Sequence, residues 1–239
     1  MIEQKKIKEI VGRHAVEALV QSGMKLGLGT GSTAIHAVRH VGALLKEGKL
    51  KNIMAVPTSF QTSIECEKWG IPLFTLNSIE INGRLDLTID GADEVDPKSR
   101  LIKGGGGALL VEKIVAYASD SYAIAVDESK IVENLGLVFP VPVEVIPEAR
   151  IPVKNALEKL GAEVILREAL RMAGPVITDH GNLILDLRFS YPLDPCLMEA
   201  ELNSIPGVVE NGFFTGPADR ILRPLIFIGF SDGRVEQRN

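Results

Sequence analysis

Three segments of the chain combine glycines, hydroxyls, carboxylates and a lysine at spacings that suit chemistry. The first is Gly27-Leu-Gly-Thr-Gly-Ser-Thr33, which follows a short apolar run and precedes an amphipathic stretch. Glycines let a ligand approach the backbone closely, and the free N–H groups at the start of a helix attract anions. Thr30, Ser32 and Thr33 add hydroxyl donors around Gly31. The segment therefore predicts a site for a phosphate group.

The same glycines allow a dinucleotide site as a weaker interpretation. Gly29-x-Gly31-x-x-Ala34 matches a relaxed dinucleotide fingerprint, but such a site needs an acidic residue at the end of the next strand. That strand ends Val56-Pro-Thr-Ser59 and has no carboxylate, and no lysine follows in the pattern of a P-loop. We therefore expect a small phosphate ester, with a ligand-free strand–helix turn as the alternative.

The second segment, Asp90-Gly-Ala-Asp-Glu-Val-Asp96, places four carboxylates within seven residues. It follows a predicted buried strand, and open α/β sheets bind ligands beyond the carboxyl ends of their strands. Asp90 and Asp93 are therefore candidates for proton transfer or for holding sugar hydroxyls. The spacing of a calcium loop is absent. A magnesium site and a solvated acidic turn are the alternatives.

The third segment, Lys103-Gly-Gly-Gly-Gly-Ala-Leu-Leu-Val-Glu112, places four consecutive glycines between a strand and a helix. Glycine is the costliest residue to order, so stability does not explain the run. The N–H groups of Gly104, Gly105 and Gly106 would face a developing oxyanion, with the charge of Lys103 at the loop entrance. Glu112, about one turn into the helix, would act as a base toward carbon. A flexible loop with a surface glutamate is the alternative.

Short apolar strands alternating with amphipathic helices would position these segments. The pattern predicts helices over 4–21, 33–45, 59–70 and 108–118, and strands over 24–28, 53–57, 73–76, 85–89 and 122–126. This alternation indicates an α/β fold, with a Rossmann-like, mostly parallel sheet and helices on both faces. Lys130 follows the last of these strands, where it would reach a phosphate or simply face solvent.

The pattern changes near Pro140, where PVPVEVIPEARIP carries four prolines and excludes a helix. Beyond it the sequence predicts helices over 153–160 and 195–204 and strands over 163–166, 176–178, 183–187 and 208–214. This βαββαβ-like order suggests a small α+β ferredoxin-like lobe over 141–212. A last strand over 225–230 would return to the first sheet, so that 1–140 and 213–239 form the catalytic domain. The polar tail 231–239 is expected to fray.

Composition narrows the function classes. The chain has 239 residues, of which 46% are hydrophobic and 24% charged, as in a soluble globular protein. Its net charge of −5 disfavours nucleic acid as a partner. No apolar run reaches the roughly 18 residues that span a bilayer, and the start MIEQKKIKEIV does not resemble a signal peptide. The two distant cysteines, Cys66 and Cys196, fit a reducing compartment, so we expect a cytoplasmic protein.

Six segments, in order along nearly the whole chain, resemble those of ribose-5-phosphate isomerase type A. They are Gly29-Thr-Gly-Ser-Thr-Ala34, Asp90-Gly-Ala-Asp-Glu94, Lys103-Gly-Gly-Gly-Gly-Ala108 with Glu112-Lys-Ile114, Val141-Pro-Val-Glu-Val-Ile-Pro147, Thr178-Asp-His-Gly-Asn182 and Ile205-Pro-Gly-Val-Val209. Each segment alone is a weak signal, whereas six together are highly specific.

The resemblance implies interconversion of ribose 5-phosphate and ribulose 5-phosphate without a metal or an organic cofactor. It implies Glu112 as the base that moves a proton between C2 and C1 through an enediolate. Lys103 and the glycine loop would steady the oxyanion, and Asp90 and Asp93 would assist ring opening and hydroxyl proton transfer. The resemblance also implies a homodimer or homotetramer, in which the small lobe takes part in oligomerisation.

The resemblance further implies that Thr30, Ser32, Thr33 and Lys130 hold the phosphate or neighbouring hydroxyls. Lys8 falls where the family has another phosphate-binding lysine, although the family's Lys-Lys pair reads Lys8-Glu9 here. The stretch Pro57-Thr-Ser-Phe-Gln-Thr62 follows one variant of the family's substrate loop.

Two other functions remain open at this point. A CoA transferase on a similar scaffold would use a glutamate as a covalent nucleophile, and it would need a surface for a large nucleotide thioester. A sugar-phosphate sensor of a transcriptional regulator would need a DNA-binding helix-turn-helix and a basic face. The sequence shows no surface for a nucleotide thioester, no helix-turn-helix and no basic face. A sensor would also not need a base such as Glu112.

Overall fold

The computed structural model describes residues 2–217 and 222–238. The chain folds into two compact units. The first comprises Met1–Ala92, Val111–Ile131 and Gly216–Asn239, and the second comprises Asp93–Leu110 and Val132–Thr215. This division differs from the sequence-based boundaries mainly at 93–110 and 132–140, which the structure groups with the second unit.

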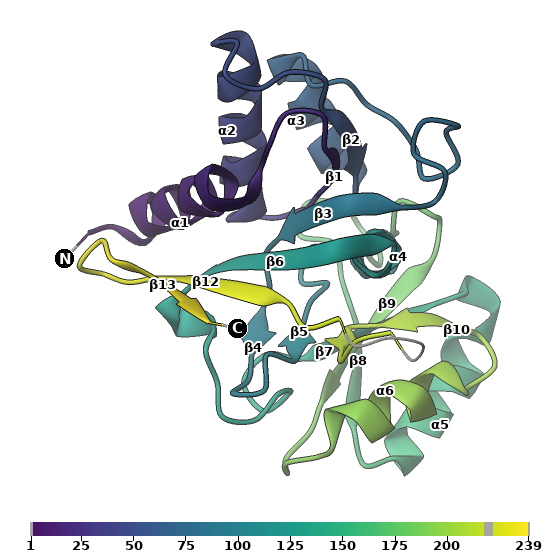
Figure 1. Ribbon diagram of the computed structural model, residues 1–239. Coiled ribbons are helices and arrows are strands. Elements are labelled where there is room, and N and C mark those ends of the chain that lie inside the picture. Colours follow the sequence, from purple (N-terminus) through teal and green to yellow (C-terminus); the bar gives the residue numbers. More distant parts are fainter. Residues whose placement is uncertain (1, 218–221, 239) are drawn as a thin grey trace. The chain divides into compact units, whose positions relative to one another are not determined.

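The first unit is built on a six-stranded sheet (Figure 1). Its strands are β1 (Lys25–Leu28), β2 (Met54–Pro57), β3 (Leu85–Asp90), β6 (Ser119–Asp127), β12 (Leu225–Gly229) and β13 (Val235–Arg238). They lie in the order β13-β12-β6-β3-β1-β2. All neighbours pair in parallel except β13, which is antiparallel to β12. The predicted, mostly parallel sheet is therefore confirmed.

Two predictions about this sheet are wrong. The expected strand over 73–76 is reduced to a single bridge between Leu73 and Ala55. A turn follows at once, in which the Ser78 N–H donates to the Thr75 carbonyl and the Thr75 N–H donates to the Ser78 hydroxyl. The tail was expected to fray, but Val235–Arg238 forms β13 along the open edge of β12. Polar residues suit an antiparallel edge strand because it can remain open to solvent.

Helices cover both faces of this sheet. The helices of the first unit's chain segments are α1 (Gln4–Leu19), α2 (Ala34–Lys46), α3 (Phe60–Trp69) and α4 (Leu109–Tyr117), the last of which begins in the second unit. One apolar core joins α1, α2 and α3 to Leu26, Leu28 and Leu87 of the strands. On the opposite face, Val115 of α4 packs so closely that a Cβ on Gly27 would lie 2.5 Å from its Cγ1.

The second unit contains a four-stranded antiparallel sheet in the order β10-β7-β9-β8. Its elements are β7 (Val141–Val145), α5 (Arg150–Lys159), β8 (Glu163–Leu166), β9 (Leu183–Arg188), α6 (Pro195–Asn203) and β10 (Val208–Asn211). Helices α5 and α6 share an apolar core with one face of the sheet (Figure 1). Both orders are those of a ferredoxin-like fold, as predicted for this lobe. The strand expected over 176–178, however, is reduced to a single bridge between Ile177 and Leu183.

A small three-stranded sheet belongs to the same unit. Its strands are β4 (Glu94–Val95), β5 (Leu101–Ile102) and β11 (Phe213–Phe214). The strand predicted over 208–214 is thus split at Gly212. A Cβ at Gly212 would lie 2.5 Å from Pro142 Cδ, and the Gly212 carbonyl accepts the Lys103 N–H at 2.9 Å. Gly212 therefore fixes the backbone at which the glycine loop begins.

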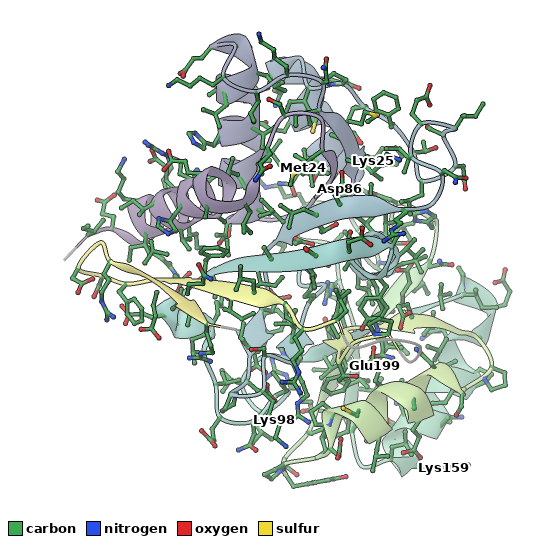
Figure 2. The ribbon with its side chains drawn as sticks, viewed as in Figure 1. Met24, Lys25, Asp86, Lys98, Lys159 and Glu199 are labelled. Atoms are coloured by element: carbon green, nitrogen blue, oxygen red, sulfur yellow. The ribbon has the colours of Figure 1, made fainter. Side chains whose placement is uncertain are left out.

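Side-chain bonds fix the ends of elements within each unit. In the first unit, the Lys25 N–H at the start of β1 donates to Asp86 Oδ2 on β3 at 2.7 Å. In the second, Glu199 on α6 accepts from the N–H and hydroxyl of Thr215. Figure 2 labels Lys25, Asp86 and Glu199. Short 3-10 helices occupy Glu128–Lys130 and Pro147–Ala149. Among the described residues, no helix is long and apolar enough to cross a membrane.

Candidate active site

The loop between β1 and α2 is held against the end of β3 by Asp90. The Asp90 side chain is fully buried, and its Oδ1 accepts the Thr30 N–H at 3.0 Å and the Gly91 N–H at 2.7 Å. A Cβ on Gly29 would lie 2.0 Å from the same oxygen. Gly29 is therefore required because a carboxylate occupies the space of its side chain. Gly31 has a φ of +109°, which also favours glycine.

A cluster of hydroxyls lies behind this loop. The Thr30 hydroxyl is 2.7 Å from that of Thr58, 2.6 Å from that of Ser59 and 3.1 Å from that of Thr62. Thr62 also donates to the Gly29 carbonyl at 2.8 Å. A hydroxyl offers one donor and two acceptor positions, so these neighbours occupy the Thr30 side chain. In this structure Thr30 anchors the loop.

The remaining predicted phosphate ligands of the first unit lie around the same loop or the same sheet edge. Lys8 on α1 donates to the Ser32 hydroxyl at 2.9 Å, so the structure brings these two residues together. Thr33 is the N-cap residue of α2, although its side chain makes no capping hydrogen bond. Lys130 follows β6, whose carboxyl end shares an edge with those of β3 and β1. The start of the 13-residue α2 adds a positive helix dipole at this edge.

Glu112 lies on the face of the first unit's sheet that α4 covers. It is 3% exposed and precedes Val115 by three residues, which places both on one side of the helix. Thr88 donates to the Val115 carbonyl at 3.4 Å, and Asp90 is two residues beyond Thr88 on the same strand face. Glu112 and Asp90 therefore share this face of the sheet.

Tyr122 on β6 supports that placement. Its side chain faces the same side of the sheet as that of Thr88, with which it pairs in register. Burial raises the pKa of the Tyr122 phenol well above its ordinary value, and the nearby charges of Asp90 and Glu112 raise it further. Both carboxylates thus lie close enough to act on one phenol, which stays protonated.

The glycine loop of the second unit is held by Asp93. Asp93 Oδ2 accepts the Gly105 N–H at 2.7 Å, and a Cβ on Gly105 would lie 2.6 Å from Asp93 Oδ1. Gly104 and Gly107 have φ values of +97° and +77°, and the Gly107 N–H donates to the Gly104 carbonyl at 2.9 Å. The run of glycines is therefore a folded turn, and the Gly105 N–H is already bonded to Asp93.

Lys103 is buried at the start of this loop. Its side chain is 2% exposed, and its Nζ lies 5.5 Å from the centre of the Phe214 ring. A buried ammonium group is costly, and positions of this kind are typical of functional sites.

The other two carboxylates of the acidic segment have structural partners. Glu94 accepts the N–H groups of Gly136 and Phe139 at 2.7 and 2.6 Å, and Asp96 pairs with Arg100 at 2.6 Å. Within residues 2–217 and 222–238, no group of three or more His, Cys, Asp or Glu side chains is arranged to hold a metal ion.

Sequence reasoning missed two parts of this arrangement. It assigned 57–62 to a substrate loop but gave no role to the hydroxyls of that loop. Their position is a signal that could have been used, because Thr58, Ser59 and Thr62 lie just before and within the first turn of a predicted helix. It also gave no role to Arg167, whose guanidinium contacts the glycine loop. No local signal marks Arg167, because its partners are distant in the sequence.

Comparison with known proteins gives a consistent result. Residues 54–224 match the family described as ribose 5-phosphate isomerase A (phosphoriboisomerase A). The ribose-5-phosphate isomerase A of Treponema denticola is 52% identical, over 98% of this chain and 99% of that protein. That of Thermosynechococcus vestitus is 51% identical over 91% of each chain.

Solved structures show the same similarity. A D-ribose-5-phosphate isomerase in complex with phospho-erythronic acid superimposes with a TM-score of 0.92 at 38% identity, over 100% of both chains. The ribose 5-phosphate isomerase A of Methanocaldococcus jannaschii superimposes with a TM-score of 0.89 at 41% identity, over 99% of this chain and 100% of that one.

The hydroxyl cluster behind the first loop can be tested by Thr62→Val. This variant keeps the shape of the side chain but removes the hydroxyl that donates to the Gly29 carbonyl and one of the three hydroxyl partners of Thr30. We expect the free energy of unfolding in urea to fall by about 1–3 kcal/mol. Thr75→Val, at an exposed threonine bonded to Ser78 at 3.3 Å, is the matched control. Equal effects of the two variants would contradict the anchoring role.

Proposed function

The chain belongs to the ribose 5-phosphate isomerase A family and is an aldose–ketose isomerase of ribose 5-phosphate; we propose that Glu112 is the base of this reaction. The non-oxidative pentose phosphate pathway is the known context of the family. The observation that carries the proposal is the placement of a buried Glu112 with Asp90 on one face of the sheet, where Asp90 also holds the loop that follows β1.

The reaction moves hydrogen between two carbons without net oxidation. Glu112 removes the proton from C2 of the open-chain aldose, and the electron pair passes into the C1 carbonyl to give an enediolate. The same carboxyl group returns the proton to C1, while the proton of the C2 hydroxyl is transferred to the C1 oxygen, which leaves a ketone at C2 and a hydroxyl at C1. Positioned acid–base groups of this kind typically contribute about 10²- to 10⁴-fold to a rate.

Lys103 and the glycine loop supply charge stabilisation in this proposal. As the carbonyl oxygen becomes negative, the ammonium group of Lys103 and backbone N–H groups of Gly104–Gly106 stabilise it. The burial of Lys103 supports the assignment, because a charge excluded from water acts more strongly on its target. The Gly105 N–H already donates to Asp93, so Gly106 is a better candidate than Gly105 for a direct contact.

Asp90 and Asp93 assist ring opening and the transfer of hydroxyl protons in this proposal. Both also bond the backbone of a loop, Asp90 at Thr30 and Asp93 at Gly105. Replacing either one would therefore change loop structure together with proton transfer.

Ser32, Thr33, Gly31, Lys8 and Lys130 bind the phosphate in this proposal, with Thr30 anchoring their loop. The bond from Lys8 to Ser32 supports the inclusion of Lys8, although the second lysine of the family's pair is Glu9 here. A related isomerase was solved with phospho-erythronic acid, which carries a carboxylate and a phosphate on one short chain. Separate sites for an oxyanion and a phosphate would suit such a ligand. Family membership also favours the isomerase over a CoA transferase or a transcriptional sensor.

The assembly and location belong to the same proposal. We propose a cytoplasmic homodimer or homotetramer in which the ferredoxin-like lobe takes part in oligomerisation. The two cysteines are free, Cys66 buried and Cys196 exposed, which suits a reducing compartment. The mass of the protein in solution, measured by light scattering, decides between the two assemblies, and a monomer would contradict both.

An assay with ribose 5-phosphate in the presence of EDTA tests the reaction and its independence from metal. Because the proposed chemistry uses only side chains and backbone N–H groups, we expect ribulose 5-phosphate to form at the same rate with and without chelator. Loss of turnover that added Mg²⁺ restores would show that the set of groups is incomplete. The absence of ketose under both conditions would reopen the sensor interpretation.

Glu112→Gln tests the base. An amide cannot accept the C2 proton, so we expect kcat to fall by at least about 100-fold. The phosphate ligands are untouched, so inhibition by inorganic phosphate should keep its wild-type strength. Glu67→Gln, at an exposed glutamate on α3, controls for the loss of one carboxylate. Near-normal turnover of Glu112→Gln would remove Glu112 from the mechanism.

A further inference from the structure

Arg167 connects the four-stranded sheet of the second unit to the glycine loop. It follows β8 directly, and its side chain is 15% exposed. Nε and Nη2 donate to the two carboxylate oxygens of Asp186 on β9, at 2.8 and 2.5 Å. Nη1 donates to the Gly104 carbonyl at 3.0 Å and to the Gly105 carbonyl at 3.1 Å. One guanidinium group therefore fixes two consecutive peptide groups of the loop.

These two bonds determine where the following N–H groups point. In a trans peptide the C=O and N–H vectors are antiparallel, and the described chain contains no cis peptide bond. The Gly104 carbonyl faces Arg167, so the Gly105 N–H faces the other way, and there it meets Asp93. The Gly105 carbonyl also faces Arg167, so the Gly106 N–H likewise points away from the guanidinium group.

The loop needs such a restraint because glycine peptides rotate easily. Four adjacent glycines have access to many backbone conformations, and a flipped peptide would present a carbonyl where an N–H is required. Arginine suits the task better than lysine, because its planar fork can bind a carboxylate with two nitrogens while the third donates elsewhere. Asp186 holds the guanidinium in that orientation from the neighbouring strand.

We propose that Arg167, oriented by Asp186, is a positioning residue for the isomerisation: it holds the Gly104 and Gly105 carbonyls so that the Gly106 N–H is presented to the developing oxyanion. The proposal rests on the assignment of the glycine loop as the oxyanion site. Arg167 acts through the loop backbone, so its effect falls on the transition state and spares the binding of phosphate.

Arg167→Gln and Arg167→Lys test this role in the full-length enzyme. Loss of a single oxyanion donor costs about 10²- to 10³-fold in kcat, and misplacement of one should cost somewhat less, so we expect a fall of roughly 10- to 100-fold. The KM for ribose 5-phosphate should stay close to the wild-type value. Asp186→Asn should reproduce part of the defect, and the double variant should be no worse than Arg167→Gln, because both act through one contact.

Two inhibitors separate positioning from a general loss of structure. Phospho-erythronic acid carries a carboxylate at the end that an oxyanion site would hold, so its inhibition constant should rise about 10-fold or more in Arg167→Gln, in parallel with kcat. Inorganic phosphate probes only the phosphate site, and its inhibition constant should not change. Arg188→Gln, at an exposed arginine two residues beyond Asp186, should behave as wild type in both assays.

The outcomes distinguish this inference from the proposed function. Provided that Glu112→Gln is inactive, either of two results for Arg167→Gln would overturn the positioning role. One is a wild-type kcat, and the other is an equal rise of the inhibition constants of phospho-erythronic acid and inorganic phosphate. If Glu112→Gln stays active, the proposed role of Glu112 as the base fails. Should Arg167→Gln not fold, Arg167→Lys gives the same readouts: wild-type kcat and inhibition overturn the role, and a selective loss of kcat and of phospho-erythronic acid binding supports it.

Discussion

The first unit's part of the candidate site depends on the contacts of one carboxylate, that of Asp90. One of its oxygens accepts the N–H groups of Thr30 and Gly91, and it occupies the space in which Gly29 would carry a side chain. Hydrogen bonds to an ionised carboxylate are stronger than those between neutral groups. The end of β3 thereby determines the path of the loop that leaves β1. Thr30, held at its N–H by Asp90, then engages the hydroxyls at the start of α3.

In the second unit, too, an aspartate accepts a backbone N–H of a loop and lies against a glycine. Asp93 lies against Gly105 and accepts its N–H, as Asp90 lies against Gly29 and accepts the next N–H. In both cases glycine is needed because a carboxylate has taken the place of a Cβ. Burying ionisable side chains costs stability, and Asp90, Lys103 and Glu112 are all at most 3% exposed. Buried ionisable side chains of this kind are typical of functional sites.

Most of the fold could be predicted from the sequence, because strands and helices are indicated by patterns of neighbouring residues. Apolar runs of four to six residues followed by glycine or aspartate indicated the strands that end at Leu28 and Asp90. The features that were missed depend on partners distant in the chain. Gly212 interrupts a strand because Pro142 lies against it, and β13 forms because β12 offers an open edge. Arg167 meets Gly104 across 63 positions, so no spacing rule could pair them.

The two loops should contribute to different kinetic constants. The phosphate group is the same in the aldose, the enediolate and the ketose, so contacts with it stabilise all three alike and mainly lower KM. Charge on the carbonyl oxygen, by contrast, develops only as the C2 proton leaves, so contacts with it act on kcat. Lys103, the glycine loop and Glu112 lie within ten consecutive residues of the chain, whereas the phosphate loop ends 70 positions earlier, at Thr33. In the proposed mechanism, the groups that respond to the transition state therefore lie in one short segment of the sequence. Restraints on the backbone of that segment, such as those from Asp93 and Arg167, then bear on the rate more than on the affinity for substrate.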